Sequence, residues 1–203
     1  GEAAVVQLVE GVQRQLQVAC GPLSDAVVAA LASGRTDGLP GVPPDTDPLG
    51  RDLQLALYTL YELHYRGFAG VDAELEWDPD ILRLRRGLEG GFLGYLRRAV
   101  EPGDDPVAEM DALSVEATSG TGPSWYFAGE GTWDQLREYF AHRSLYHLKE
   151  GDPHAFTIPR LQGQAKASFV AVEFDEFGGG RGERVHQRLW EDLMGAAGLD
   201  ASY

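Results

Sequence analysis

The chain has a single cysteine, Cys20, among its 203 residues. One thiol excludes an internal disulfide framework and favours a reducing compartment, so we expect a cytoplasmic protein. Because Cys20 follows Val18 and Ala19, we expect a buried structural thiol. The chain also lacks an apolar run long enough to cross a bilayer, and its start lacks a basic segment followed by an apolar one. We therefore expect no membrane span and no secretory signal.

Positive charge is scarce as well. The chain has 17 Lys and Arg against 32 Asp and Glu, a formal net charge of -15. Such a charge repels nucleic acid and anionic lipid alike, and the basic residues are scattered rather than clustered. A nucleic-acid partner is therefore not expected.

Patterns typical of strands are rare. Alternation of Val170, Val172 and Phe174 with polar or small residues is the exception, and Pro159 upstream favours a helix there. The length suits one sizeable core, so we predict an all-α protein with a single helical domain over 1–203, divided into auxiliary and first bundle helices (1–131) and later core helices (132–203). Helical spacing and breakers predict helices over about 5–16, 24–30, 51–66, 79–96, 106–116, 132–150, 159–177 and 183–194.

Several residues mark the helix ends. Ser24 can cap the second helix, and Gly34 can end it. Thr132 and Gln135 have the spacing of a capping box. The pair Gly90-Gly91 is expected to weaken or bend its helix, and the run 178–180 (GGG) is expected to interrupt another.

Glu176 is a candidate metal ligand. On a helical wheel it lies within about 60° of Leu161, Ala165, Phe169 and Val172, so it continues an apolar stripe. A carboxylate on such a stripe needs a cation, a hydrogen-bond partner or a proton. Glu173 and Asp175 fall to its sides, where solvent is expected to reach them. The alternative is that Glu176, in the last turn, simply reaches solvent.

His186 and Glu150 have a similar character. His186 shares a predicted face with Trp190 and Leu193, where a satisfied core histidine is the alternative to a ligand. Glu150 lies on an aromatic face, and Arg143 offers it an ion pair instead of a metal. His142 and His147 are expected beside this face as packing or supporting groups.

Spacing favours a shared site. Three successive helical segments each offer one inward donor, and two carboxylates with one imidazole suit iron or manganese. The glycine run 178–180 can re-aim the segment that carries His186. His154 follows Glu150 by four residues, but Pro153 breaks the register between them, so a ligand role for His154 is not expected.

These residues lie in a segment that resembles a known family. The motif KE-x-DPH (149–154), then DEFGGG (175–180) and a later histidine, resembles the haem-oxygenase-like di-iron oxidases and oxygenases, often called iron-containing redox enzymes. The upstream segments LYELHYRGF (60–68) and WDPDILRLRRGLE (77–89) are similar to actinobacterial members. The resemblance implies a haem-oxygenase-like helical bundle with Glu150, Glu176 and His186 as metal ligands.

The sequence departs from the family in one respect. The family's third core helix brings an H-x3-[DE]-x2-H type cluster, and no such motif occurs here. We therefore expect part of a longer protein, incomplete at the C-terminus, or a chain that takes ligands from a partner, such as a missing C-terminal half or a second copy in a homodimer. Three protein ligands would hold one metal weakly, and a stable two-metal centre is not expected from them alone.

The resemblance implies an enzyme that activates O2 at two non-haem irons, with manganese as the alternative metal, and oxidises a small amine, amino acid or fatty acid. Two other classes stay open. One is a metal-free enzyme on the same scaffold, because fold does not fix chemistry. The other is a non-catalytic helical module that binds another subunit.

Overall fold

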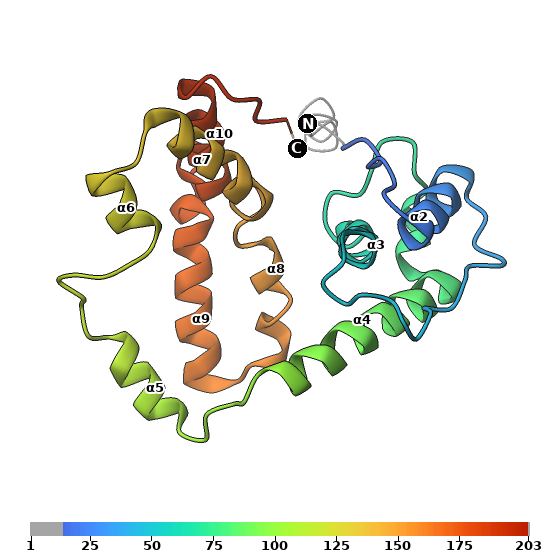
Figure 1. Ribbon diagram of the computed structural model, residues 1–203, viewed down its shortest axis with the longest axis horizontal. Coiled ribbons are helices and arrows are strands. Elements are labelled where there is room, and N and C mark those ends of the chain that lie inside the picture. The colour runs from blue at the N-terminus through green and yellow to red at the C-terminus, as the bar shows by residue number, and fades with distance from the viewer. Residues whose placement is uncertain (1–13, 203) are drawn as a thin grey trace. The chain divides into compact units, whose positions relative to one another are not determined.

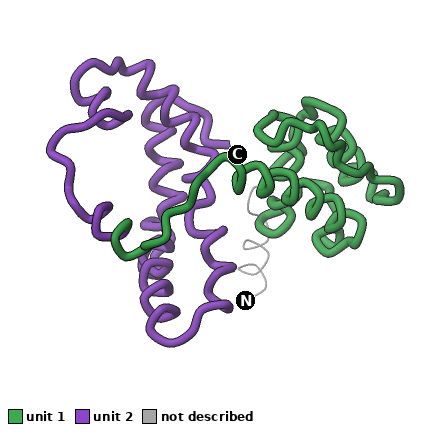
Figure 2. The backbone as a smooth tube through the Cα atoms, turned by 60° about the horizontal axis from the view of Figure 1, so that its bottom comes forward, with its two compact units in different colours: residues 1–109 green, residues 110–203 purple. Residues whose placement is uncertain are grey.

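The computed structural model describes residues 14–202 of the chain. The predicted first helix, over about 5–16, lies almost wholly outside the described residues. Contacts divide the chain into two compact units, residues 1–109 and 110–203, shown in green and purple in Figure 2. Each unit is described by itself. The single helical domain expected from the sequence stays a prediction.

The first unit is built on three helices, α2 (Pro22–Ser33), α3 (Arg51–Glu62) and α4 (Pro79–Ala99) (Figure 1). Helix α3 packs against both α2 and α4. The apolar stripes of the three helices and the loops between them bury one core. It consists of Leu23, Val27, Leu31, Leu53, Ala56, Leu57, Leu60, Leu63, Phe68, Leu75, Ile81, Leu84 and Leu88.

The helix ends in this unit follow the sequence closely. Asp78 accepts hydrogen bonds from the backbone N–H groups of Asp80 and Ile81, and Pro79 is the first residue of α4. Gly34 ends α2 in the left-handed conformation, with φ of 69°. Helix α4 continues through Gly90 and Gly91, and the weakening or bending expected there stays a prediction. Helix α3 ends at Glu62, four residues earlier than predicted.

Asp52 on α3 holds the first turn of α2. Its carboxylate accepts hydrogen bonds from the Leu23 N–H (2.9 Å), the Ser24 N–H (2.7 Å) and the Ser24 hydroxyl (2.6 Å). This approach requires glycine at position 21, because a Cβ there would lie 2.4 Å from the Asp52 Cγ. Ser24 is therefore not the N-cap expected from the sequence. The cap is supplied by a carboxylate from the neighbouring helix.

We predict that the Asp52 carboxylate makes the stability of the first unit depend on pH, with a loss of stability in acid. Burial acts to raise the pKa of Asp52, but the hydrogen bonds from Ser24 and Leu23 outweigh it and hold the pKa below the ordinary 3.8. A lowered folded-state pKa adds stability above the unfolded-state pKa, and this is lost as the pH falls through the folded value. Asp52→Ala should cost about 2 kcal/mol at neutral pH.

Hydrogen exchange of the α2 amides measures this effect at pH 7 and below pH 4. The difference between wild type and Asp52→Ala should shrink in acid. A loss that is equal at both pH values would contradict the role of the charge.

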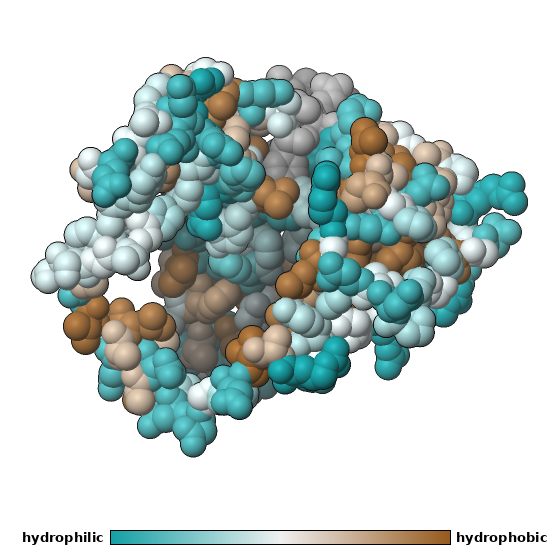
Figure 3. Space-filling view, in the orientation of Figure 1, coloured by the Kyte–Doolittle hydropathy of each residue, from teal (hydrophilic) through white to brown (hydrophobic). Residues whose placement is uncertain are grey.

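Two helices follow α4. Helix α5 (Pro106–Leu113) lies within the predicted acidic stretch, and α6 (Pro123–Gly129) was not predicted. Helix α5 leaves Val107, Met110 and Leu113 largely exposed, and brown and teal atoms both lie over this region in the space-filling view (Figure 3).

The second unit contains α7 (Trp133–His147), the short α8 (Asp152–Ala155), α9 (Gly163–Glu176) and α10 (His186–Ala196). The Thr132 hydroxyl accepts from the Gln135 N–H, and the Gln135 side chain accepts from the Thr132 N–H, so the predicted capping box is confirmed. Helix α10 packs against α7 (Figure 1), where Phe140 and Trp190 meet edge to face at 5.8 Å.

The all-α class is confirmed for residues 14–202, where the structure contains helices and no named strand. The alternating segment 170–175 belongs to α9, as predicted. No described helix is long and apolar enough to cross a membrane. Cys20 is exposed, so the expectation of a buried thiol is wrong.

Candidate metal centre

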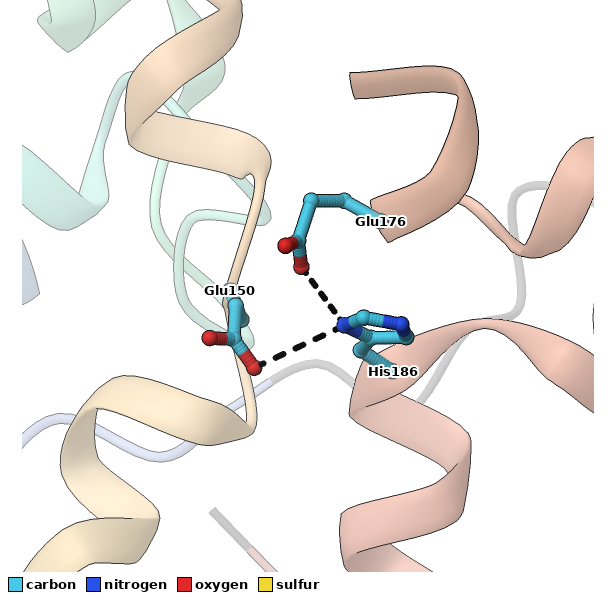
Figure 4. A group of neighbouring side chains, drawn as sticks. All are labelled: Glu150, Glu176 and His186. Carbon is cyan, nitrogen blue, oxygen red and sulfur yellow. Dashed lines mark ion pairs between the residues drawn. The ribbon is translucent and has the colours of Figure 1, made fainter. Parts of the chain in front are cut away.

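Glu150, Glu176 and His186 come together in the second unit. Glu150 lies in the turn after α7, Glu176 is the last residue of α9, and His186 is the first residue of α10 (Figure 4). One ligand atom from each lies within 4.8 Å of the others. The structure thus brings together the three residues expected to bind metal. Their role as ligands stays a prediction.

Two glycines allow this approach. Gly151 has φ of 90°, and a Cβ there would lie 3.1 Å from the Phe177 ring and 3.5 Å from the Glu176 Cβ. The turn that carries Glu150 can therefore rest against the end of α9. Gly178, with φ of 70°, lies so close to the backbone of Arg184 and Val185 that a Cβ would be 2.6 Å from the Arg184 carbonyl carbon.

The glycine run between α9 and α10 re-aims the chain, as the sequence suggested. All three glycines have positive φ, and α10 begins at His186 itself. The break therefore turns the His186 ring back towards the end of α9.

The contact between Glu176 and His186 does not have the geometry of an ordinary hydrogen bond. The His186 Nδ1 lies 2.7 Å from the Glu176 Oε2 and 4.0 Å from the Glu150 Oε2. The Glu176 Oε2 is buried and accepts no hydrogen bond among the described residues. The nitrogen and the oxygen are therefore close to each other without a hydrogen bond between them.

This arrangement fits a metal ion. Donors about 2.1 Å from an ion lie about 3 Å apart when adjacent and about 4 Å apart when opposite. The two distances from His186 are near these values, and a buried oxygen without a donor is satisfied by a cation. Carboxylate oxygens and an imidazole suit iron or manganese. Three ligands leave further coordination positions for other groups.

His147 supports Glu150. Its Nε2 lies 3.2 Å from the Arg143 Nη2, and its Nδ1 lies 2.9 Å from the Glu150 Oε2. Because arginine only donates, the Nε2 accepts and the Nδ1 carries the proton given to Glu150. The ring also stacks on Trp190 of α10 at 4.0 Å between centroids. Arg143 therefore acts on His147, and the alternative ion pair from Arg143 to Glu150 is not formed among the described residues.

Helix α10 is tied to the same turn by Gln187. Its side-chain amide donates to the Asp152 carboxylate at 2.9 Å and to the Glu150 carbonyl at 3.3 Å. Gln187 is buried and adjacent to His186, so these bonds fix the start of α10 against the turn that carries Glu150.

The field around the centre is negative. Burial raises the pKa of the Tyr146 phenol, and the charges of Glu150 and Glu176 raise it further against a weaker opposite effect of Arg143. Tyr146 therefore keeps its proton at neutral pH. A negative potential of this kind attracts a cation.

The sequence analysis assigned some residues of α9 to the wrong side of the helix. Val172, expected in the core stripe that leads to Glu176, is 55% exposed, whereas Glu173, expected to be solvated, is 3% exposed. His154, for which no ligand role was expected, lies with its Nδ1 3.3 Å from the Glu173 Oε1. His186 is partly exposed at the surface. The alternative interpretation of His186, as a hydrogen-bonded histidine within the core, is therefore wrong as well.

We predict that His147 strengthens metal binding through Glu150. His147→Phe keeps a ring on Trp190 but removes the N–H donated to Glu150. Loss of a group that orients a ligand lowers metal affinity about 10- to 100-fold. His142→Phe on the same helix is the matched control, because His142 is exposed and forms an ion pair at 3.7 Å with the exposed Glu138. Competition with a coloured chelator measures both affinities, and equal values would contradict the role.

Comparison with known proteins agrees with this geometry. Residues 137–203 match the model of the family described as iron-containing redox enzyme, which confirms the resemblance over the segment that holds all three candidate ligands. The match supports a haem-oxygenase-like helical fold and, at a coarse level, an oxidoreductase that contains iron. Among curated proteins, no sequence matches the chain.

Proposed function

We propose that Glu150, Glu176 and His186 hold iron, and that the chain is part of a non-haem oxidoreductase that activates O2. The observation that carries this proposal is the buried Glu176 oxygen without a hydrogen-bond donor, placed 2.7 Å from an imidazole nitrogen. The family match over the same segment supports iron over other cations. The complete enzyme would use a di-iron carboxylate site to oxidise a small amine, amino acid or fatty acid.

Each residue has a separate task. Bound iron would supply the electrons for O2 reduction. Glu150 and Glu176 supply negative charge that favours oxidised over reduced metal, and His186 supplies a neutral donor. His147 orients Glu150 through its Nδ1–H. Tyr146 holds its proton beside both carboxylates, where O2 reduction consumes protons.

Further ligands for a complete di-iron site would come from residues outside these three, in the same protein or in a partner. The cofactor expected is iron, with manganese as the alternative, and the other reactants are O2 and a small-molecule substrate. The cytoplasmic location stays a prediction.

Anaerobic loading with Fe(II) tests the proposal. We expect iron to remain with the protein through gel filtration and to be quantified by mass spectrometry. Addition of air should then consume O2, measured with an oxygen electrode, faster than the same iron without protein. A chain that retains no iron would overturn the metal site. Retained iron with no O2 uptake would overturn the O2 chemistry alone.

One observation favours a second candidate, a helical module that assembles with another subunit. Helix α9 exposes Val170, Val172 and Phe174, and α10 exposes Leu189 and Leu193. Exposed apolar faces of this kind mark interaction sites. Light scattering coupled to gel filtration tests assembly, and a self-associating chain that binds no iron would favour the module over the oxidoreductase.

A further inference from the structure

A groove open to solvent lies between α3 and α4 in the first unit. It has a volume of about 500 Å³ and is lined by Gln54, Leu57, Tyr58, Tyr61, Glu89, Phe92, Leu93 and Leu96. The groove is continuous with the core, because Leu57 belongs to the core and Phe92 packs against it. Leu93 is 45% exposed and Leu96 is 36% exposed. The two helices thus leave apolar surface uncovered along the groove.

The polar groups of this groove already have partners. The Tyr61 hydroxyl donates a hydrogen bond to the Glu89 Oε1 at 2.6 Å, and the same oxygen lies 3.2 Å from the Arg85 Nε. The charge of Glu89 is therefore compensated within the unit. An occupant of the groove needs apolar side chains rather than a charged group.

The described part of the chain begins beside the groove. The Arg14 Nη1 donates to the hydroxyl of Tyr58, a groove residue, at 3.2 Å. The Arg14 carbonyl accepts from the Ala69 N–H at 2.7 Å, and Arg14 forms an isolated parallel bridge with Phe68. Residues 1–13 are therefore joined to the chain at a fixed point, one side chain away from the groove.

The sequence of these thirteen residues suits such a groove. Their larger apolar side chains include Val5, Leu8, Val9 and Val12. This is the i, i+3, i+4, i+7 spacing of a helix that binds in an apolar groove, and it covers about 10 Å of helix. The groove residues extend over the same length, from Gln54 to Tyr61 on α3 and from Glu89 to Leu96 on α4.

We propose that residues 1–13 form an amphipathic helix that docks in the groove between α3 and α4 and covers Leu93 and Leu96. A helix of this length is marginal in water by itself, so burial of its apolar stripe is what stabilises it. Direct attachment beside the groove gives the segment an effective concentration in the millimolar range. This favours the segment over a second copy of the chain at lower concentration.

A photoreactive side chain tests the contact in the full chain. Leu93→p-benzoylphenylalanine should, on irradiation, form a cross-link to a peptide within residues 1–13, identified by mass spectrometry. Tyr61→p-benzoylphenylalanine repeats the test from α3 with an aromatic replacement. Arg98→p-benzoylphenylalanine is the matched control, because Arg98 is exposed on α4 and lies about 120–180° around the helix from its groove residues. It should form no cross-link to 1–13.

Two changes in the segment test the apolar stripe. Val9→Asp, combined with the photoreactive group at position 93, should lower the yield of the cross-link about 10-fold, because burial of one valine accounts for at least that factor. Gln7→Glu adds the same charge about 160° away on the helix and should leave the yield unchanged. An equal loss in both variants would contradict docking through the stripe.

The other occupants give different products. A cross-link between two chains, seen as a doubled mass, would assign the groove to a second copy. A cross-link to residues 110–203 would assign it to the second unit. Either product in place of the expected one, or no cross-link from position 93 or 61, would overturn the proposal.

Discussion

Glu176→Gln should lower the affinity for Fe(II) by at least about 100-fold, because even groups that only orient a ligand cost up to that factor. The glutamine keeps the size of the side chain but removes the charge from the oxygen that lies 2.7 Å from His186. The amide also offers the ion one neutral oxygen in place of a carboxylate. Competition of Fe(II) between the protein and a coloured chelator measures the change.

The variant is expected to fold normally. The Glu176 Oε2 accepts no hydrogen bond among the described residues, so its loss leaves no donor unsatisfied. Glu183→Gln is the matched control, because Glu183 lies between the two candidate ligands in sequence and is exposed. It should bind Fe(II) as tightly as wild type. If Glu176→Gln did so too, the centre would not be a metal site.

The three candidate ligands could be predicted because their chemistry depends on residue type and order. Glu150, Glu176 and His186 each lie at the end of a helical segment, and sequence breakers mark those ends well. Gly151 and Gly178 then bring the ends together through backbone conformations that only glycine adopts easily. The residues that converge can therefore be identified from the sequence close to each of them.

The burial of Glu173 and its contact with His154 could not be predicted from the sequence, and the reason is physical. A helical wheel assigns the buried face from apolar side chains, and α9 exposes Val170, Val172 and Phe174 instead. Burial in the second unit is set by contacts between segments, and Leu148, Met194 and Ala197 are the buried apolar residues described there. The spacing of Glu173 and Glu176, three apart on one face, was the available signal.

Helix ends were easier to predict than helix faces. Asp78 with Pro79, and Thr132 with Gln135, act through hydrogen bonds within four residues, so the sequence contains the whole interaction. The start of α2 was harder, because Asp52 caps it from 28 residues away. Capping by a distant residue has no local pattern.

A buried ion pair in the first unit leads to the second large prediction. The Arg14 Nη1 lies 2.5 Å from the Glu62 Oε2, and the two side chains are 2% and 0% exposed. Arg14 also contacts the Tyr58 hydroxyl at 3.2 Å, and its carbonyl accepts from the Ala69 N–H. Arg14→Met should destabilise the unit by about 3–5 kcal/mol, because the substitution removes one partner of a buried ion pair.

Hydrogen exchange of the α3 amides, followed by mass spectrometry of peptides over 51–62, reports the free energy of opening in this unit. The double variant Arg14→Met with Glu62→Leu should recover much of the loss, since removal of both charges also removes their desolvation cost. A double variant as unstable as the sum of two single variants would show that the two residues act independently. The buried pair would then contribute through packing and its other contacts rather than through charge.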